Sequence, residues 1–426
     1  MTKKIIILFI LFAAASVLFA QAVPGENLTI KIAVAGQGDE LYFWWGHIAL
    51  VIQDSDTGRG RFYDYGIFSF ENDDFFKNFA YGLMLYKCMV SSEDRNIELY
   101  KERNRNIVYF TLDLPPEAKL MVRDFVENNV LPENSDYYYH HFKDNCSTRI
   151  RDIIDMAVGG QFYEKYGQMP SGFTLRDHVR RHTYHSPFYD WILNFWMGQV
   201  IDTPLTVWED MFLPEEVGKR ISEFWYTDSD GQMRKLVPSE TDPQIIYTAT
   251  GRRPVLEFPR KQWPSMLVFS LLLSALFGSF FFMYSKKIPA GKVLTGISMS
   301  LCGLVFGVAA SLLYFLNIFT NHDYTFENYN MLFASPLLLA AVPLGICYAF
   351  SKKPERQFIY DLLLRLLWLL TVIGILITMI IKLFPAFYQQ NLPEQMLMLP
   401  IALLFAFQPV GLRQIIEKVF RSRKVM

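Results

Sequence analysis

This chain of 426 residues has almost no net charge and lacks repeats. Basic and acidic residues nearly balance, which leaves a formal net charge of −1, so no overall field argues for nucleic acid as a partner. Basic residues form no block apart from the short tail Arg421–Lys424. No internal repeat and no low-complexity segment is visible, so a solenoid or fibrous architecture is not indicated.

Cysteine is also scarce, with four residues in the whole chain. Cys302 and Cys347 fall in apolar runs, where they are expected to be buried as small hydrophobic residues. Cys88 and Cys146 share the more polar half. A disulfide between these two is therefore an alternative to a free, reactive Cys146.

Hydrophobic residues, in contrast, make up 51% of the chain and are concentrated after about residue 264. Five apolar runs each approach the ~20 residues that a helix needs to cross a bilayer, and they cover 265–284, 293–318, 331–350, 359–383 and 396–410. Lysine and arginine gather in alternate connections and in the tail, as expected for cytoplasmic segments. We therefore predict a five-helix transmembrane domain over 263–426 with a cytoplasmic C-terminus. Arg365 would lie inside the fourth run and face the bundle or extend to the interface.

The N-terminus has the features of a secretory signal. Lys3 and Lys4 precede the apolar stretch Ile5–Phe19, and Ala20-Gln21-Ala22 supplies small residues for cleavage. Residues 1–22 are therefore predicted to be a signal peptide. Residues 23–262 would form the periplasmic domain of an inner-membrane protein.

The first part of that domain is predicted to be rich in β-strands. Strand candidates are 28–35, 41–53, 61–68 and 107–114. A turn cluster over 54–60 would join the second and third as an antiparallel pair. Pro115 and Pro116 then open a helix that is predicted to end near Asn129.

A cysteine stands where a later helix ought to begin. Ile150, Ile153, Ile154 and Ala157 have the i, i+3, i+4, i+7 spacing of one helical face, which places Cys146 in the first turn. Asp144 or Asn145 could cap this helix by accepting a bond from an early backbone N–H. Free N–H groups and the helix dipole there stabilise a thiolate, and this favours nucleophilic catalysis if a base is nearby.

The candidate base is His47, near the start of the second predicted strand. The third strand contains Phe62-Tyr63-Asp64-Tyr65-Gly66 and would lie antiparallel beside it. Asp64 or Tyr65 would then come within reach of the imidazole, and a carboxylate there would fix its tautomer. A solvated strand residue is the alternative for Asp64. The later His178, His182 and His185 lack companions with tight ligand spacing, so packed or solvated histidines are favoured over a metal site.

Three segments resemble a known family, the Lnb N-terminal periplasmic domain. They are Trp45-Gly46-His47-Ile48-Ala49-Leu50, residues 62–70, and the run 144–152 around Asn145-Cys146, and Phe212-Leu213-Pro214 also fits. The order of His before Cys is similar to the circularly permuted NlpC-type papain fold, which includes lecithin:retinol acyltransferase. The resemblance implies an α+β fold in which a permuted papain-like periplasmic domain precedes the five-helix transmembrane bundle. Family members often carry Asn where this chain has Asp64, so the orienting role stays open.

The resemblance further implies lipoprotein N-acyltransferase activity without a cofactor. Cys146 would be the nucleophile, His47 the base and Asp64 its partner, with Asn145 and Ser147 supporting the oxyanion at the helix start. The acyl donor would be a membrane phospholipid and the acceptor the α-amine of a diacylated lipoprotein. Tyr65, His322, Asn328 and Asn330 are candidates for substrate binding; the last three lie in a connection that resembles the membrane part of the Bacteroidetes members, and a merely polar loop is the alternative.

Two other classes of function remain open on the sequence. A membrane-bound thiol hydrolase, such as a phospholipase or an envelope amidase or peptidase, would use the same two residues with water as acceptor. A sensor or assembly factor could instead keep the fold with an inert Cys146.

Overall fold

The computed structural model describes residues 23–68, 74–239 and 243–408. The predicted signal peptide and the basic tail lie outside the described residues. The chain divides into two compact units. The first consists of Met1–Ser69, Met84–Ser171 and Thr206–Arg253, and the second of Phe70–Leu83, Gly172–Leu205 and Pro254–Met426. The helical unit thus includes two segments from the N-terminal half of the chain, Phe70–Leu83 and Gly172–Leu205.

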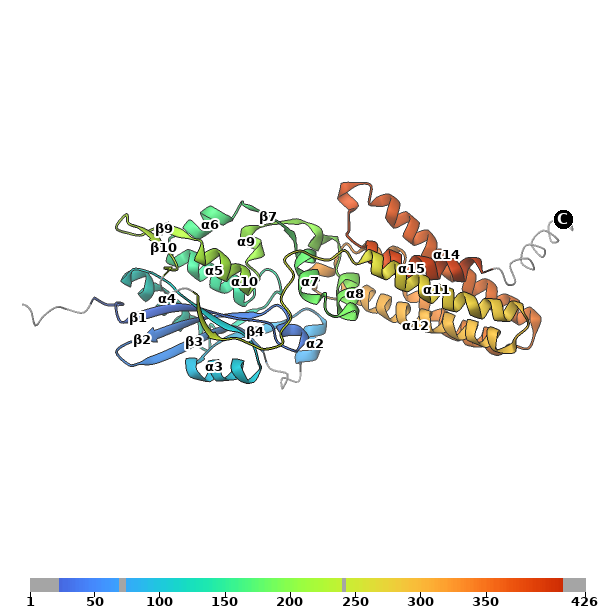
Figure 1. Ribbon diagram of the computed structural model, residues 1–426, viewed down its shortest axis with the longest axis horizontal. Helices are drawn as coiled ribbons and strands as arrows, with labels where there is room; N and C mark the ends of the chain where they lie inside the picture. Colours follow the sequence, from blue (N-terminus) through green and yellow to red (C-terminus); the bar gives the residue numbers. More distant parts are fainter. Residues whose placement is uncertain (1–22, 69–73, 240–242, 409–426) are drawn as a thin grey trace, which may run out of the picture. The chain divides into compact units, whose positions relative to one another are not determined.

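An antiparallel sheet of seven strands is the centre of the first unit (Figure 1). Its order is β11-β5-β1-β2-β3-β4-β6. The strands are β1 Leu28–Ala35, β2 His47–Asp54, β3 Arg59–Ile67, β4 Leu85–Ser92, β5 Ile107–Thr111, β6 Asp136–Tyr138 and β11 Gln244–Tyr247. The predicted strand 28–35 is confirmed with its bounds, and the hairpin of the second and third strands is confirmed as β2 and β3.

Helices cover both faces of this sheet, because both faces of its central strands are apolar. Helices α4, α5 and α10 lie on one face and α3 on the other (Figure 1). Ile30, Ile32 and Leu50 pack with Ile150 and Val217 on the first face. Ala49 and Val51 pack with Tyr100 on the second. The helices of this unit are α3 Glu93–Glu102, α4 Pro116–Asn129, α5 Cys146–Ala157, α6 Gln161–Tyr166, α9 Val207–Asp210 and α10 Pro214–Ser222, with the 3-10 turn η1 Leu41–Phe43 and the hairpin β9 Trp225–Thr227 and β10 Met233–Lys235.

The second unit is helical. Its helices are α2 Phe75–Ala80, α7 Leu175–Thr183, α8 Pro187–Trp196, α11 Trp263–Ser285, α12 Pro289–Phe319, α13 Ala341–Phe350, α14 Pro354–Ile381 and α15 Leu392–Phe407, with five 3-10 turns η2 Gln199–Asp202, η3 Asp323–Thr325, η4 Tyr329–Leu332, η5 Pro336–Ala340 and η6 Pro385–Phe387. The short strands β7 Pro170–Thr174 and β8 Pro204–Thr206 pair with each other. Small residues allow close helix packing here, since a Cβ on Gly296 of α12 would approach the Gly345 carbonyl of α13 to 2.4 Å.

Three helices in the described part are long and apolar enough to cross a membrane, namely α11, α12 and α14. The predicted runs 331–350 and 396–410 correspond to shorter apolar helices, Pro336–Phe350 and Leu392–Phe407. The first of these starts as 3-10 turns at Pro336, since proline cannot continue a preceding helix. Five crossings therefore remain a prediction. Arg365 faces the interior as predicted, where it bonds to Asp361 at 2.8 Å and to the Gln408 carbonyl at 2.8 Å.

Candidate active site

The candidate nucleophile is the first residue of α5, as the sequence predicts. Asn145 caps the helix, because its side-chain oxygen accepts bonds from Ser147 N at 2.9 Å and Thr148 N at 3.0 Å. The Thr148 hydroxyl returns a bond to the Asn145 N–H at 2.8 Å, which completes a capping box. Asp144 is not the cap; it forms an ion pair with Arg149, in which Nη2 lies 2.7 Å from Oδ2.

The Asn145 amide nitrogen also holds the surrounding loops. It donates to the carbonyls of His141 at 2.8 Å and Phe212 at 2.9 Å. The Phe212 carbonyl belongs to the short segment before α10, so a remote part of the chain is tied to the helix start. Asn145 is 5% exposed, and its role is to position Cys146 rather than to meet a substrate.

His47 and Asp64 come together across the β2–β3 hairpin. His47 Nε2 lies 2.5 Å from Asp64 Oδ1, and the two side chains are 18% and 13% exposed. The turn into β2 depends on Gly46, which has φ +77° and whose added Cβ would lie 2.8 Å from the Ala35 carbonyl. Only glycine fits that position without strain, so Gly46 sets the direction in which His47 enters the sheet.

The Cys146 sulfur reaches the same place from the helical side. The His47 ring and the Ile48 backbone N–H both act on this sulfur, and each lowers the pKa of Cys146. The pairing of β2 with β3 begins only at Ala49 and Asp64, one residue beyond Ile48. Beyond Asp64 the β3–β4 register shifts at a bulge, where Gly66 has φ +85°. A bulge of this kind commonly redirects backbone and side chains beside an active site.

Electrostatics in this triad favour a thiolate and an imidazolium. Burial lowers the pKa of His47, but the Asp64 carboxylate, with smaller contributions from Tyr100 and Cys146, outweighs it and holds this pKa well above its usual 6.5. Burial raises the pKa of Cys146, but the charge and hydrogen bond of His47 and the Ile48 N–H bring it below its usual 9.0. Both shifts favour the pair Cys–S⁻ and His–H⁺, the form needed for nucleophilic attack.

This ion pair predicts an unusual pH profile for alkylation. The rate of carboxamidomethylation of Cys146 should reach half its maximum below pH 9, because a lowered pKa keeps the thiolate populated as the pH falls. The Asp64→Asn variant should lower the pKa of His47 and raise that of Cys146. Labelling at neutral pH should then fall about tenfold for each unit by which the pKa of Cys146 rises. Peptide mapping by mass spectrometry assigns the label, and a wild-type midpoint at or above pH 9 would contradict the prediction.

One backbone donor at the helix start remains for a developing oxyanion. The N–H groups of Ser147 and Thr148 are used by the cap, and the Arg149 N–H bonds to the Asn145 carbonyl at 3.1 Å. Within the described residues, the Cys146 N–H has no acceptor. Support of an oxyanion by Asn145 and Ser147 stays a prediction; the Ser147 side chain is fully buried, and the Cys146 N–H is a further candidate donor.

The alternative disulfide is not present, since Cys88 and Cys146 are free thiols. Burial raises the pKa of Cys88 to about 12, so this thiol stays protonated at neutral pH. Sequence reasoning missed Ile48 and Tyr100 as neighbours of the site. A backbone N–H leaves no trace in the sequence, and Tyr100 on α3 is brought near His47 only by the tertiary fold.

The other candidate residues belong to the helical unit. His322, Asn328 and Asn330 are buried, and their side chains bond to the chain itself. His322 Nε2 lies 2.9 Å from the Phe79 carbonyl, and the amides of Asn328 and Asn330 both donate to the Phe195 carbonyl. These bonds hold the η3–η4 segment to α2 and α8, and substrate binding by these residues remains a prediction.

The three neighbouring histidines are not grouped as metal ligands in the described part of the chain. His182 Nδ1 lies 2.7 Å from the His178 carbonyl, and His178 Nδ1 lies 2.8 Å from Arg181. Burial lowers the pKa of His182 to about 3, so its ring is neutral at physiological pH.

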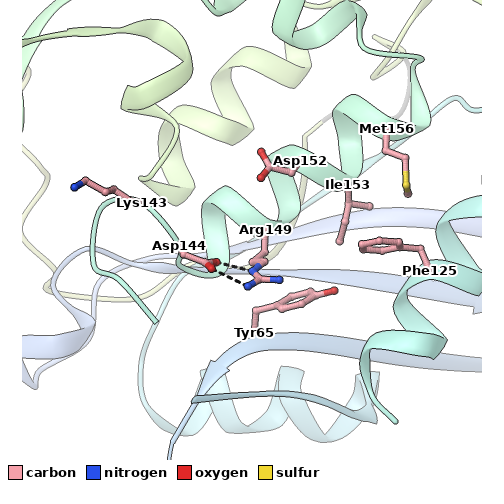
Figure 2. Close-up of a pocket in the computed structure, with 8 residues that line it drawn as sticks. All are labelled: Tyr65, Phe125, Lys143, Asp144, Arg149, Asp152, Ile153 and Met156. Carbon is pink, nitrogen blue, oxygen red and sulfur yellow. Dashed lines mark hydrogen bonds and ion pairs between the residues drawn. The ribbon is translucent and has the colours of Figure 1, made fainter. Parts of the chain in front are cut away.

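A pocket of about 390 Å³ lies beside the nucleophile helix (Figure 2). It is lined by Tyr65, Phe125, Lys143, Asp144, Arg149, Asp152, Ile153 and Met156. Figure 2 shows the charged side chains of Lys143, Asp144 and Arg149 toward one end and the apolar Phe125 and Met156 at the other. The pocket therefore has the character of an amphiphile site, and its volume falls within the range of small-molecule sites.

Helix geometry connects this pocket with the nucleophile. Arg149, Ile153 and Met156 follow Cys146 by three, seven and ten residues, so all four lie along one face of α5. At 1.5 Å per residue, Met156 lies about 15 Å along the helix axis from Cys146. Tyr65, the residue after Asp64, lines the pocket from β3. Tyr65, a predicted substrate-binding residue, thus lines a cavity, and its binding of a substrate stays a prediction.

Comparison with known proteins found a family model that matches the N-terminal part of the chain. Residues 16–181 match the family model of the Lnb N-terminal periplasmic domain, a stretch that contains Cys146, His47 and Asp64. No curated protein and no solved structure matched the chain. A periplasmic domain and three apolar helices together fit an inner-membrane protein with its N-terminal domain in the periplasm. Residues 16–181 of this chain are therefore similar to the Lnb N-terminal periplasmic domain.

Proposed function

We propose that this protein is a thiol-dependent lipoprotein N-acyltransferase of the bacterial inner membrane. The observation that supports this most directly is the meeting of Cys146, His47 and Asp64, which come from three separate segments. The proposal includes a permuted papain-like fold for the sheet unit and a multi-pass helical unit with a cytoplasmic C-terminus. The acyl donor is a phospholipid and the acceptor a diacylglyceryl-cysteine lipoprotein.

In the first step the Cys146 thiolate attacks the carbonyl carbon of a phospholipid ester. The negative charge moves to the carbonyl oxygen, which the Cys146 N–H stabilises. The carbon–oxygen bond then breaks, and the imidazolium of His47 gives its proton to the departing alkoxide. Lysophospholipid leaves, and the acyl chain stays on sulfur as a thioester.

In the second step the α-amine of the lipoprotein attacks the thioester carbonyl. His47, now neutral and oriented by Asp64, takes a proton from the attacking nitrogen as the carbon–sulfur bond breaks. The products are an N-acylated lipoprotein and the regenerated thiolate–imidazolium pair. No cofactor is required by this balance of atoms and charge.

The pocket along α5 suits the acyl chain of the thioester. Its apolar end is formed by Phe125, Ile153 and Met156, farther from Cys146 than the charged end. Each methylene moved from water into such a site contributes about 0.8 kcal/mol. The length of the pocket would then set the preferred chain length.

A Met156→Trp variant should shift the enzyme toward shorter acyl chains. Loss of room for two methylenes corresponds to about 1.6 kcal/mol, or roughly tenfold in relative transfer of long against short chains. The measurement is competition between phospholipids of different chain lengths with purified enzyme. Met121→Trp is the matched control, because Met121 lies on α4 near Phe125 but does not line the pocket. If the Met156→Trp variant has the same chain-length preference as the wild type, the pocket does not bind the acyl chain.

The experiment that tests the function is mass spectrometry of lipoprotein N-termini from a deletion strain. Loss of the third acyl chain, restored by the wild-type gene, is the result expected for a transferase. A hydrolase that uses the same residues would instead release fatty acid in vitro and leave triacylated lipoproteins present in the deletion strain. A protein without enzymatic activity would show neither effect, and its Cys146 would not react with a thiol probe at neutral pH.

A further inference from the structure

A group of buried charges in the helical unit has no part in the site described above. It consists of Arg180 on α7, Asp190 on α8 and Glu394 in the first turn of α15. They are 9%, 0% and 1% exposed, respectively. Helix α8 contacts both α7 and α15, and electrostatic interactions link the three side chains, so they lie in one region of the unit.

Each of these side chains has a buried polar atom without a hydrogen-bond partner among the described residues. The atoms are Arg180 Nε, Asp190 Oδ2 and Glu394 Oε2. The neighbouring Gln395, which is fully buried, has both of its amide atoms unpartnered. Leaving a single buried polar group unpaired costs roughly 1–3 kcal/mol, and a charged group costs more. Unpaired atoms on all three charged side chains of one group indicate that the group binds something polar.

The remaining atoms of the same groups are firmly held. Arg180 Nη1 and Nη2 donate to Gln390 at 3.1 and 2.8 Å. Asp190 Oδ1 accepts from the Thr183 hydroxyl at 2.6 Å and from Asn194 Nδ2 at 3.1 Å. Burial nevertheless raises the pKa of Asp190 to about 6, so its charged form would gain from a cation nearby. The unpaired atoms are thus presented by side chains already fixed in position.

The charges around this group sum to zero, which limits the ligand. Arg176, Arg180 and Lys382 are the cations, and Asp190, Asp202 and Glu394 are the anions. Arg176 and Asp202 satisfy each other at 2.7 Å, and Lys382 Nζ donates to Asn391 at 2.9 Å. A neutral cluster with unpaired acceptors and unpaired donors matches a zwitterion better than a simple anion or cation.

The cluster lies where helices of the bundle end. Candidate span α14 ends at Ile381, and α15 begins at Leu392, two residues before Glu394. Charged side chains at the ends of membrane-spanning helices lie at the level of lipid headgroups. A lipid headgroup is therefore the zwitterion that this place would meet.

We propose that the cluster of Arg180, Asp190, Glu394 and Gln395 binds the headgroup of a phospholipid that carries a primary ammonium, of the phosphoethanolamine type. The ammonium donates to Asp190 Oδ2 and Glu394 Oε2. The phosphate accepts from Arg180 Nε and the Gln395 amide. This inference rests on the proposed function in that it names the class of phospholipid that the membrane unit selects, but binding itself requires no acyl transfer.

The test is lipid binding to the purified full-length chain, measured by native mass spectrometry. A Cys146→Ser background prevents consumption of the lipid. The probes are phosphatidylethanolamine, phosphatidylglycerol and phosphatidylcholine with identical acyl chains. We expect phosphatidylethanolamine to be retained about tenfold more than either of the others, since one lacks the ammonium and the other lacks its N–H donors.

Two variants test whether the preference for phosphatidylethanolamine depends on this cluster. Glu394→Gln and Asp190→Asn should each abolish it, whereas Glu355→Gln, at the exposed opposite end of α14, should preserve it. Equal retention of the three lipids by the parent protein would overturn the proposal without recourse to a variant. So would a preference that survives in both cluster variants, or displacement of phosphatidylethanolamine by a short peptide with a free α-amine. Because the parent protein is catalytically inactive, none of these results depends on whether acyl transfer occurs.

Discussion

Replacement of Cys146 by alanine is expected to abolish lipoprotein N-acylation, with a fall of at least 10⁴-fold in the rate of transfer. The expectation follows from the proposed mechanism, in which the Cys146 sulfur carries the acyl chain. Removal of a catalytic nucleophile has effects of this order in other enzymes. Folding should be preserved, because the capping box is formed by Asn145 and Thr148 and does not involve the thiol. The measurement is the mass of lipoprotein N-termini in a deletion strain that expresses the variant.

Cys88→Ala is the matched control for this experiment. Cys88 is a second buried free thiol of the same unit, 3% exposed, and burial keeps it protonated at neutral pH. Its replacement should leave triacylated lipoproteins at the wild-type level. Full restoration of the third acyl chain by the Cys146→Ala protein would show that the proposed thioester does not exist.

Replacement of His47 by alanine is the second large effect expected, a loss of at least about 10³-fold. In the proposed mechanism His47 both stabilises the thiolate and moves the proton in each half-reaction. Residues that act together in this way give losses of activity that are not additive. The double variant Cys146→Ala with His47→Ala should therefore be no less active than either single variant. Transfer assays with purified protein at several pH values provide the measurement.

The pH dependence separates a catalytic His47 from a structural one. Without the imidazolium, the pKa of Cys146 should rise, so residual alkylation of Cys146 in His47→Ala should require a higher pH than in the wild type. A merely structural role would lower activity at all pH values and leave the midpoint of alkylation unchanged. That result, or a variant with normal transfer, would contradict the proposed base.

Local signals explain which elements could be predicted. Helix α4 begins at Pro116 and ends at Asn129, and α5 begins at Cys146. The first is marked by a proline pair, the second by a capping asparagine followed by a helical apolar face. These signals act over a few neighbouring residues, so the surrounding fold does not change their meaning.

Other elements could not be read in this way. The predicted strand 41–53 begins only at His47, because Leu41–Phe43 forms a 3-10 turn and Gly46 takes a positive φ. The aromatic and apolar residues before His47 favour a strand on sequence alone. The close approach of the Ala35 carbonyl to Gly46, which requires glycine there, is seen only in the folded chain. The apolar run 331–350 likewise contains 3-10 turns before α13, although its hydropathy resembles that of a continuous span.

By itself the sequence determined the α+β character of the first unit, the apolar helices of the second, the Cys146 helix start and the candidate pairing of Cys146 with His47. Those features follow from residue type and from short-range periodicity. Only the tertiary structure decided that Asp64 orients His47, that the Ile48 N–H meets the sulfur, and that charges from α7, α8 and α15 converge in one buried cluster. The physical reason is that thiolate stabilisation and charge burial depend on distances between remote segments, which are set by sheet register and helix packing and not by the order of residues in the chain.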